Sequence, residues 1–223
     1  TKLYMTIGNS PTCCIIGGTS LLIKCATLLH HKNWHITFIY SRDKLVIDWC
    51  IENNIKHVSQ KNELQYHLTH HSFDYLFSIV NPIILESNLL ETPKKLAINY
   101  HDSLLPKHAG MYATFWAVYN GEKQHGISWH IIDNKLDNGP VLIQKSVYIS
   151  NNDTTISLNM KCYEAAISGF KTLIEQLNED FFQTKPQQEN ERTYNAKFKR
   201  PPFACTLNFC LLYTSPSPRD DIS

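Results

Sequence analysis

The chain has 223 residues, of which 43% are hydrophobic, and this is enough for one α/β domain with a sizeable core. Its 21 lysines and arginines almost balance its 20 aspartates and glutamates, which disfavours a broad electrostatic surface for nucleic acid or an anionic membrane. The apolar stretches end well short of the roughly 20 residues that a membrane span needs.

The first half of the chain alternates short apolar runs with helical patterns. Strands are predicted at 12–16, 35–40, 56–59 and 75–80. A helix follows Gly17-Gly18, with Ser20 as its expected cap, and two more lie at 43–53, with Leu45 and Trp49 inward, and near 62–71. This alternation predicts a doubly wound, mostly parallel sheet.

The second half begins with a buried strand at Leu96-Ala97-Ile98. Met111, Phe115 and Val118 predict a buried helix, and 126–132 and 140–149 predict two strands. The short Asp133–Gly139 loop between those strands implies an antiparallel pair. The last helix carries an apolar stripe at intervals 4-3-4-3-4-3, which favours packing on the sheet: Ile156, Met160, Tyr163, Ile167, Phe170, Ile174 and Leu177. We therefore expect a Rossmann-like α/β fold with a mixed, mostly parallel sheet and helices on both faces.

The seven cysteines have no framework spacing, and neither CxxC nor HExxH occurs. We therefore expect small buried thiols in a cytoplasmic protein, and no metal site.

An amide, an imidazole and a carboxylate mark the candidate site. Asn99 and His101 stand at i and i+2 as a strand ends, so their side chains point to the same side. Ligands of open α/β sheets bind outside the carboxyl ends of the strands, which is where this pair falls. Asp137 follows on the later loop.

These residues belong to an ordered set of motifs. Asn-x-His-x-Ser-Leu-Leu-Pro spans 99–106, Gly110 follows, and then come Gly-x-Ser-x-His at 126–130 and Asp-x-Gly at 137–139. The set resembles the 10-formyltetrahydrofolate-dependent formyltransferases over about residues 12–200. That family includes glycinamide, methionyl-tRNA, sugar-nucleotide and peptide-synthetase formyltransferases and the formyltetrahydrofolate hydrolases. The resemblance implies the formyltransferase fold and a catalytic domain at 11–205.

Formyl transfer to an amine passes through a tetrahedral oxyanion, which needs a hydrogen-bond donor and a group that exchanges protons. We expect Asn99 to supply the donor, His101 to exchange protons and Asp137 to hold the imidazolium. Asp133 is another acid nearby, but only Asp137 fits the Asp-x-Gly position. His130 and Ser103 are expected to support the catalytic residues, and for His130 a buried core histidine is the competing interpretation.

The resemblance further implies that the segment after the strand at 75–80 and the loop before Asp137 hold the folate pterin. This assigns Ile83, Ile84, Leu85, Asp133 and Gly139 to the co-substrate 10-formyltetrahydrofolate. Ordinary core packing is the alternative for the three aliphatic residues. The Gly17-Gly18 turn either helps to receive the amine or is a tight turn only.

Three functions remain open: a formyltransferase, a formyltetrahydrofolate hydrolase and a non-catalytic folate-binding module. The stretch 99–130 most resembles formyltransferase-like domains fused to nonribosomal peptide synthetases, which implies an aminoacyl group on a carrier domain as acceptor. Methionyl-tRNA and sugar-nucleotide acceptors are the alternatives. We interpret residues 191–202 as a linker leaving the fold, and we expect 206–223 to be a disordered, non-native-looking tail.

Overall fold

The computed structural model describes residues 10–201. The last residues of the expected domain at 11–205 and the whole expected tail at 206–223 lie outside them. None of the helices within 10–201 is both long enough and apolar enough to cross a membrane.

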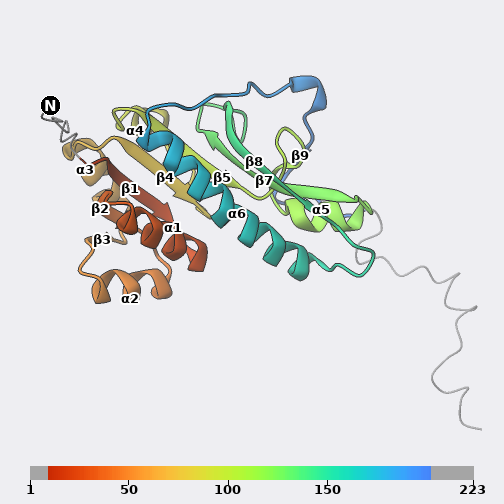
Figure 1. Ribbon diagram of the computed structural model, residues 1–223, viewed down its shortest axis with the longest axis horizontal. Helices are drawn as coiled ribbons and strands as arrows, with labels where there is room; N and C mark the ends of the chain where they lie inside the picture. Colours follow the sequence, from red (N-terminus) through yellow and green to blue (C-terminus); the bar gives the residue numbers. More distant parts are fainter. Residues whose placement is uncertain (1–9, 202–223) are drawn as a thin grey trace, which may run out of the picture.

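A seven-stranded sheet runs through the middle of the molecule (Figure 1). β1 pairs in parallel with β2 and β4, β2 with β3 and β4 with β5, whereas β7 is antiparallel to both of its neighbours. This confirms the predicted mixed, mostly parallel sheet. In spatial order the strands are β3 (His57–Val58), β2 (His35–Tyr40), β1 (Thr12–Gly17), β4 (Tyr75–Ile79), β5 (Leu96–His101), β7 (Gln124–Ile131) and β8 (Val141–Tyr148).

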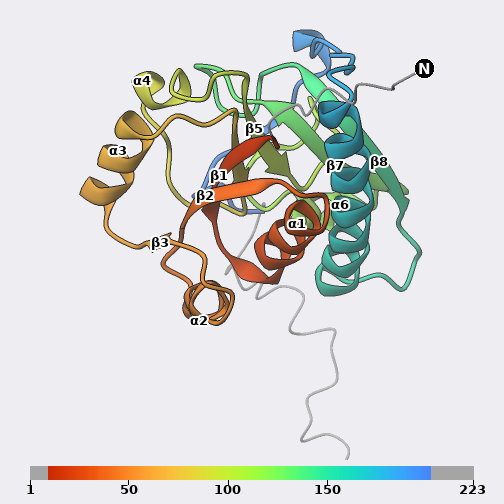
Figure 2. The same cartoon turned by 60° about the vertical axis from the view of Figure 1, so that its left-hand side comes forward.

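Helices cover both faces of this sheet, as predicted (Figure 2). One face packs against α1 (Thr19–His31), α2 (Lys44–Glu52), α5 (Ala113–Tyr119) and α6 (Thr155–Asn178). The other packs against α3 (Lys61–His70) and α4 (Ser87–Leu90). A separate two-stranded sheet joins β6 (Ala109–Gly110) to β9 (Tyr194–Asn195), just after a 3-10 turn, η1 (Glu189–Glu191).

The larger core lies between the sheet and α1 and α6. Trp129 of β7 is fully buried there, with its ring centre 4.8 Å from that of Phe170, and its indole N–H donates to the carbonyl of Ala166. β4 is buried along its whole length because helices cover both of its faces. This packing leaves the polar ends of β5 and β7 as the place where a site can form.

Two predictions about the early helices are wrong. Ser20 does not cap α1, because the helix begins at Thr19, whose N–H donates to the Asp43 carboxylate at 2.8 Å. The inward position predicted for Leu45 is wrong, since its side chain is 54% exposed, whereas Trp49 packs partly against the core. The residues that α2 buries are Val46 and Cys50.

The predicted buried faces of the later helices are also partly wrong. Met111 precedes α5, and both it and Phe115 are exposed, while Trp116 and Ala117 are buried. The stripe along α6 is buried only toward its carboxyl end, because a 3.5-residue repeat drifts around a straight helix of 3.6 residues per turn. Its exposed members are Ile156 and Met160, and the first half of α6 instead buries Leu158, Cys162 and Ala166.

Candidate active site

The antiparallel pairing of β5 and β7 assembles the centre of the site. Asn99 lies directly opposite His130, and His101 lies opposite Ser128. Ile98 and Trp129 point into the core under α6, so the four polar residues share the other face of the sheet. The sequence predicted the strand and its polar side chains, and the register explains why they meet.

A hydrogen bond joins Asn99 to His130. The ring N–H at Nδ1 of His130 donates to the carbonyl of Ile131 at 2.9 Å, so Nε2 of the neutral ring accepts from the Asn99 amide at 3.2 Å. Burial lowers the pKa of His130 to about 4, although the nearby Asp137 carboxylate opposes this shift. The ring therefore stays neutral near pH 7 and fixes the Asn99 amide with its nitrogen toward β7.

His101 is held through its other ring nitrogen. Its Nε2–H donates to the main-chain carbonyl of His108 at 2.9 Å, and its side chain is only 7% exposed. Nδ1 is the nitrogen that remains, at 3.8 Å from Asp137 Oδ2 and 4.0 Å from Asp102 Oδ1. These distances exceed a hydrogen bond, and catalytic contacts are often this long in the absence of substrate.

Asp137 faces both histidines from the loop between β7 and β8. Its backbone is left-handed (φ +49°), and Oδ2 accepts from the N–H of Gly110 at 2.9 Å. Oδ1 lies 3.7 Å from His130 Nε2. One carboxylate thus spans the two rings, and its side chain is 7% exposed.

Residues 185–195, in part predicted to be a linker, hold this loop in place. The Arg192 guanidinium donates to the carbonyls of Asp137 and Leu136, and the Gln187 amide donates to those of Asp137 and Gly139. Thr193 accepts from the N–H of His108 at 2.7 Å. The interpretation of residues 191–195 as a departing linker is therefore wrong, because they contact both the loop that carries Asp137 and the segment that carries His108.

Ser103 and Ser128 organise the turn after β5. The Ser103 hydroxyl donates to the carbonyl of Lys107 at 2.6 Å. The fully buried Ser128 hydroxyl donates to the carbonyl of Ser103 and accepts from the N–H of Leu105 and the amide of Gln144. This polar network fixes the turn that carries the His108 carbonyl.

The aliphatic residues expected to hold the folate follow β4 at the carboxyl edge of the sheet, where Asn99 and His101 also lie, but their side chains differ in exposure. Ile83 and Leu85 pack partly against the second core, whereas Ile84 is 82% exposed. Asn81 fixes this segment by accepting from the N–H of Ile83 and donating to its carbonyl. A cavity of about 160 Å³ opens beside Ile83, between the segments that follow β1, β2 and β4.

Asp133 and Gly139 shape the loop that carries Asp137. The Asp133 carboxylate accepts from the N–H of Lys135 and the amide of Asn138, so it caps the loop and does not replace Asp137. A Cβ on Gly139 would lie 1.9 Å from the carbonyl oxygen of Ile131. Only glycine allows this close approach of the two strands.

The cysteines among residues 10–201 are buried and unpaired, as predicted: Cys13, Cys14, Cys25, Cys50 and Cys162. Cys205 and Cys210 lie outside the described residues. Burial raises the pKa of Cys162 to about 12 and that of Cys50 to about 11, so neither thiol supplies a nucleophile near pH 7.

A family model described as formyl transferase matches residues 23–174, which is more than half of the chain. The chain belongs to the formyl transferase family. This confirms the resemblance carried by the motifs at 99–139.

The match to a curated relative covers only part of each protein. It is 38% identical over 117 residues to the methionyl-tRNA formyltransferase of Thermodesulfovibrio yellowstonii, and the match covers 52% of this chain but 38% of that protein. The chain therefore spans well under half the length of this curated relative.

Solved structures share the fold. WlaRD, described as a sugar 3N-formyl transferase and crystallised with dTDP and 5-N-formyl-THF, has a TM-score of 0.74 at 22% identity, covering 85% of this chain and 71% of its own. A phosphoribosylglycinamide formyltransferase from Anaplasma phagocytophilum has a TM-score of 0.69 at 21% identity, covering 84% of this chain and 99% of its own.

Proposed function

We propose that this protein transfers a formyl group from 10-formyltetrahydrofolate to a primary amine. The observation that carries the proposal is the convergence of three groups at the end of β5 and β7. The Asn99 amide is fixed by His130, the His101 ring is fixed by the His108 carbonyl, and Asp137 lies within 4 Å of both rings.

Each group has a role in this chemistry. As the amine nitrogen bonds to the formyl carbon, the carbonyl π electrons move to oxygen, and a donor such as the Asn99 amide stabilises that charge. The amine then loses a proton and the folate nitrogen gains one as its bond to carbon breaks. His101 exchanges these protons through Nδ1, and Asp137 stabilises its charged form. No step needs a metal.

The folate is assigned to the segments around Asn81 and Asp133. Ile83 and Leu85 offer apolar walls for a pterin, and the Asp133–Gly139 loop beside Asp137 is held in place by Gln187 and Arg192. The family match supports a folate donor for the domain, as does the 5-N-formyl-THF crystallised with WlaRD. Single changes at Ile83 and Asp133 that raise KM for the donor without lowering kcat would support this placement.

For the acceptor we propose an aminoacyl group tethered to a carrier domain. The amino end of α1 is the usual place for a phosphate, but here the Asp43 carboxylate accepts from the N–H of Thr19. A Cβ on Gly17 would lie 1.8 Å from the carbonyl oxygen of Ile79, so β1 and β4 approach closely at this turn. The Asp43 carboxylate at this helix end disfavours an acceptor that places its phosphate there.

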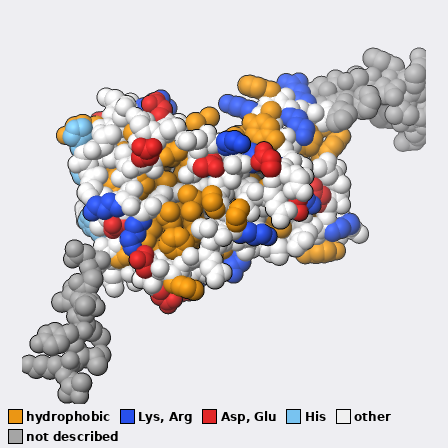
Figure 3. Space-filling view, turned by 90° about the horizontal axis from the view of Figure 1, so that it is seen from above, with side chains coloured by type: hydrophobic (Ala, Val, Ile, Leu, Met, Phe, Trp, Pro, Cys, Tyr) orange, Lys and Arg blue, Asp and Glu red, His pale blue; other side chains and the backbone are white. Residues whose placement is uncertain are grey.

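Charge distribution supports the same choice over a tRNA acceptor. The formal net charge of the chain is +1. On the face shown in Figure 3, lysine and arginine side chains are interspersed with aspartate and glutamate. A tRNA would be held by clustered basic residues.

The proposal is tested by incubating the protein with 10-formyltetrahydrofolate and, separately, an aminoacyl-loaded carrier domain, a dTDP-amino sugar, methionyl-tRNA or buffer alone. We expect formyl on the carrier-bound amine, detected by intact mass, with stoichiometric release of tetrahydrofolate. Formate release at the same rate in buffer alone would favour the hydrolase. Folate binding without turnover under any condition would favour a binding module.

A further inference from the structure

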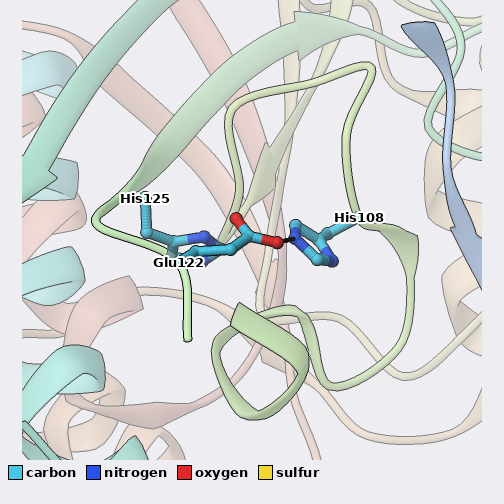
Figure 4. Close-up of side chains that lie close together, drawn as sticks. All are labelled: His108, Glu122 and His125. Atoms are coloured by element: carbon cyan, nitrogen blue, oxygen red, sulfur yellow. Dashed lines mark hydrogen bonds and ion pairs between the residues drawn. The ribbon is translucent and has the colours of Figure 1, made fainter. Parts of the chain in front are cut away.

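A second cluster of polar side chains lies beside the segment 102–108 that follows β5. His108 precedes β6, Glu122 follows α5 and His125 belongs to β7, so three segments contribute one residue each. Figure 4 shows the Glu122 carboxylate between the two imidazole rings. His108 Nε2 lies 2.7 Å from Glu122 Oε1, and one donor atom from each residue lies within 4.8 Å of the other two.

In each histidine, the ring nitrogen that would not bind the ion already has a hydrogen-bond partner. The Nε2–H of His125 donates to the carbonyl of Asp102 at 2.7 Å, which leaves Nδ1 with a free lone pair in the neutral ring. Nδ1 of His108 lies 3.2 Å from the side-chain amide of Asn195. His125 has the orientation of metal-binding histidines, which donate one ring N–H to a carbonyl and keep the other nitrogen for the ion, whereas Nδ1 of His108 accepts from the Asn195 amide.

Burial and chemistry further suit a metal ion. The two histidines are only 6% and 2% exposed, so few water molecules compete with the ring nitrogens for an ion. The Glu122 side chain is 30% exposed, which leaves a path for an ion to enter. Within residues 10–201 no other group of three histidine, cysteine or acidic side chains comes as close together.

We propose that His108, Glu122 and His125 bind one Zn²⁺ ion, with water in the fourth position. Two imidazoles and one carboxylate are a ligand set that Zn²⁺ takes at about 2.0–2.2 Å, and this set is poorly suited to Ca²⁺ or Mg²⁺. The proton on His108 Nε2 moves to Nδ1 of the same ring as the ion binds. The Asn195 amide then turns to accept it through Oδ1 and gives up its present hydrogen bond from Lys199.

The ion would stabilise the segment 102–108 and takes no part in formyl transfer. This segment contacts His101 through the carbonyl of His108, and the carbonyl of Asp102 accepts a hydrogen bond from His125. A metal here would therefore stabilise both ends of the segment 102–108. This role is independent of the proposed reaction.

The test is zinc binding by the whole protein after removal of bound metal with a chelator. We expect one equivalent of Zn²⁺ by titration calorimetry and by metal analysis after dialysis, and a higher melting temperature with the ion. His108→Gln and His125→Gln should each weaken binding by roughly a hundredfold or more, since each removes a ligand.

A partly buried histidine pair at the carboxyl end of α3 provides the control. Nδ1 of His67 and Nδ1 of His71 lie 3.3 Å apart, so they offer two nitrogens to a zinc ion. His71→Gln should bind zinc like the wild type. If either buried variant fails to fold, Glu122→Gln keeps the shape and still accepts from His108, and it should bind at least about tenfold more weakly. Absence of stoichiometric zinc, or loss of it only in His71→Gln, would overturn the proposal.

Discussion

The side-chain amide of Asn99 donates a hydrogen bond to the unprotonated Nε2 of His130, 3.2 Å away on the neighbouring antiparallel strand. The direction of this bond is set by the other ring nitrogen, which donates to the carbonyl of Ile131. His130 therefore acts as the orienting partner of the proposed oxyanion donor. Its buried position alone would not distinguish it from an ordinary core histidine.

Replacing His130 by phenylalanine tests this orienting role. His130→Phe fills the same buried space but cannot accept from Asn99, which loses a hydrogen bond worth roughly 1–3 kcal/mol at a buried site. We expect kcat to fall roughly ten- to a hundredfold, with little change in KM for the formyl donor. Steady-state kinetics measures both, and His31→Phe at the exposed end of α1 is the control. An unchanged kcat would leave His130 with a packing role only.

The same residue makes stability depend on pH. The pKa of His130 is about 4 in the folded protein, below the value near 6.5 of an exposed histidine. His130 therefore binds a proton more readily in the unfolded chain than in the folded protein. The contribution of the neutral ring to the free energy of unfolding is complete above about pH 6.5 and is lost as the pH falls toward about 4. The groups that face the ring are Asp137, His101 and Asp133.

We expect the free energy of unfolding of the wild type to fall by about 2 kcal/mol between about pH 7.5 and pH 5 through His130 alone. His130→Phe should lose that part of the dependence. His125, whose pKa is also lowered by burial, contributes with the same sign but is present in both proteins. Urea unfolding at the two pH values measures the difference. Equal pH dependence in both proteins would contradict a neutral, buried His130.

Ser128 should matter for stability because one hydroxyl serves three partners. In Ser128→Ala, the Leu105 N–H, the Ser103 carbonyl and the Gln144 amide each lose their hydrogen bond to this hydroxyl, which is fully buried. We expect a loss of about 1–3 kcal/mol in the free energy of unfolding. Thr172→Ala on the exposed side of α6, with one long bond to the carbonyl of Ser168, should cost much less. Equal losses in the two variants would argue against the network.

Much of the fold could be predicted because its signals are local. The apolar runs at β1, β2 and β4 and the short loop between β7 and β8 identify the mixed sheet without any tertiary information. The inward faces of α2 and α5 were harder, since these short helices carry apolar residues on more than one face and only packing on the sheet selects which are buried. Hydrophobic spacing alone does not define that phase.

The three central residues of the candidate site could be predicted from the sequence, but the residues that hold their loops in place could not. Asn99, His101 and Asp137 follow from motif order, and the structure brings their side chains to one place. Arg192 and Thr193 were missed because they act on main-chain carbonyls and N–H groups, which leave no pattern in a sequence. His108 likewise matters through its carbonyl oxygen, and only the structure can show that contact.

Single-turnover kinetics tests most directly whether Asn99, His101 and Asp137 perform formyl transfer. Protein in excess is mixed with 10-formyltetrahydrofolate and the carrier-bound amine, and formylated product is followed in the wild type, Asn99→Ala, His101→Ala and Asp137→Ala. We predict that each variant folds like the wild type by circular dichroism but loses most of the transfer rate. For Asn99→Ala the loss should be about 2.7–4 kcal/mol of barrier, or roughly a hundred- to a thousandfold. Transfer at close to the wild-type rate in His101→Ala or Asp137→Ala would contradict the account.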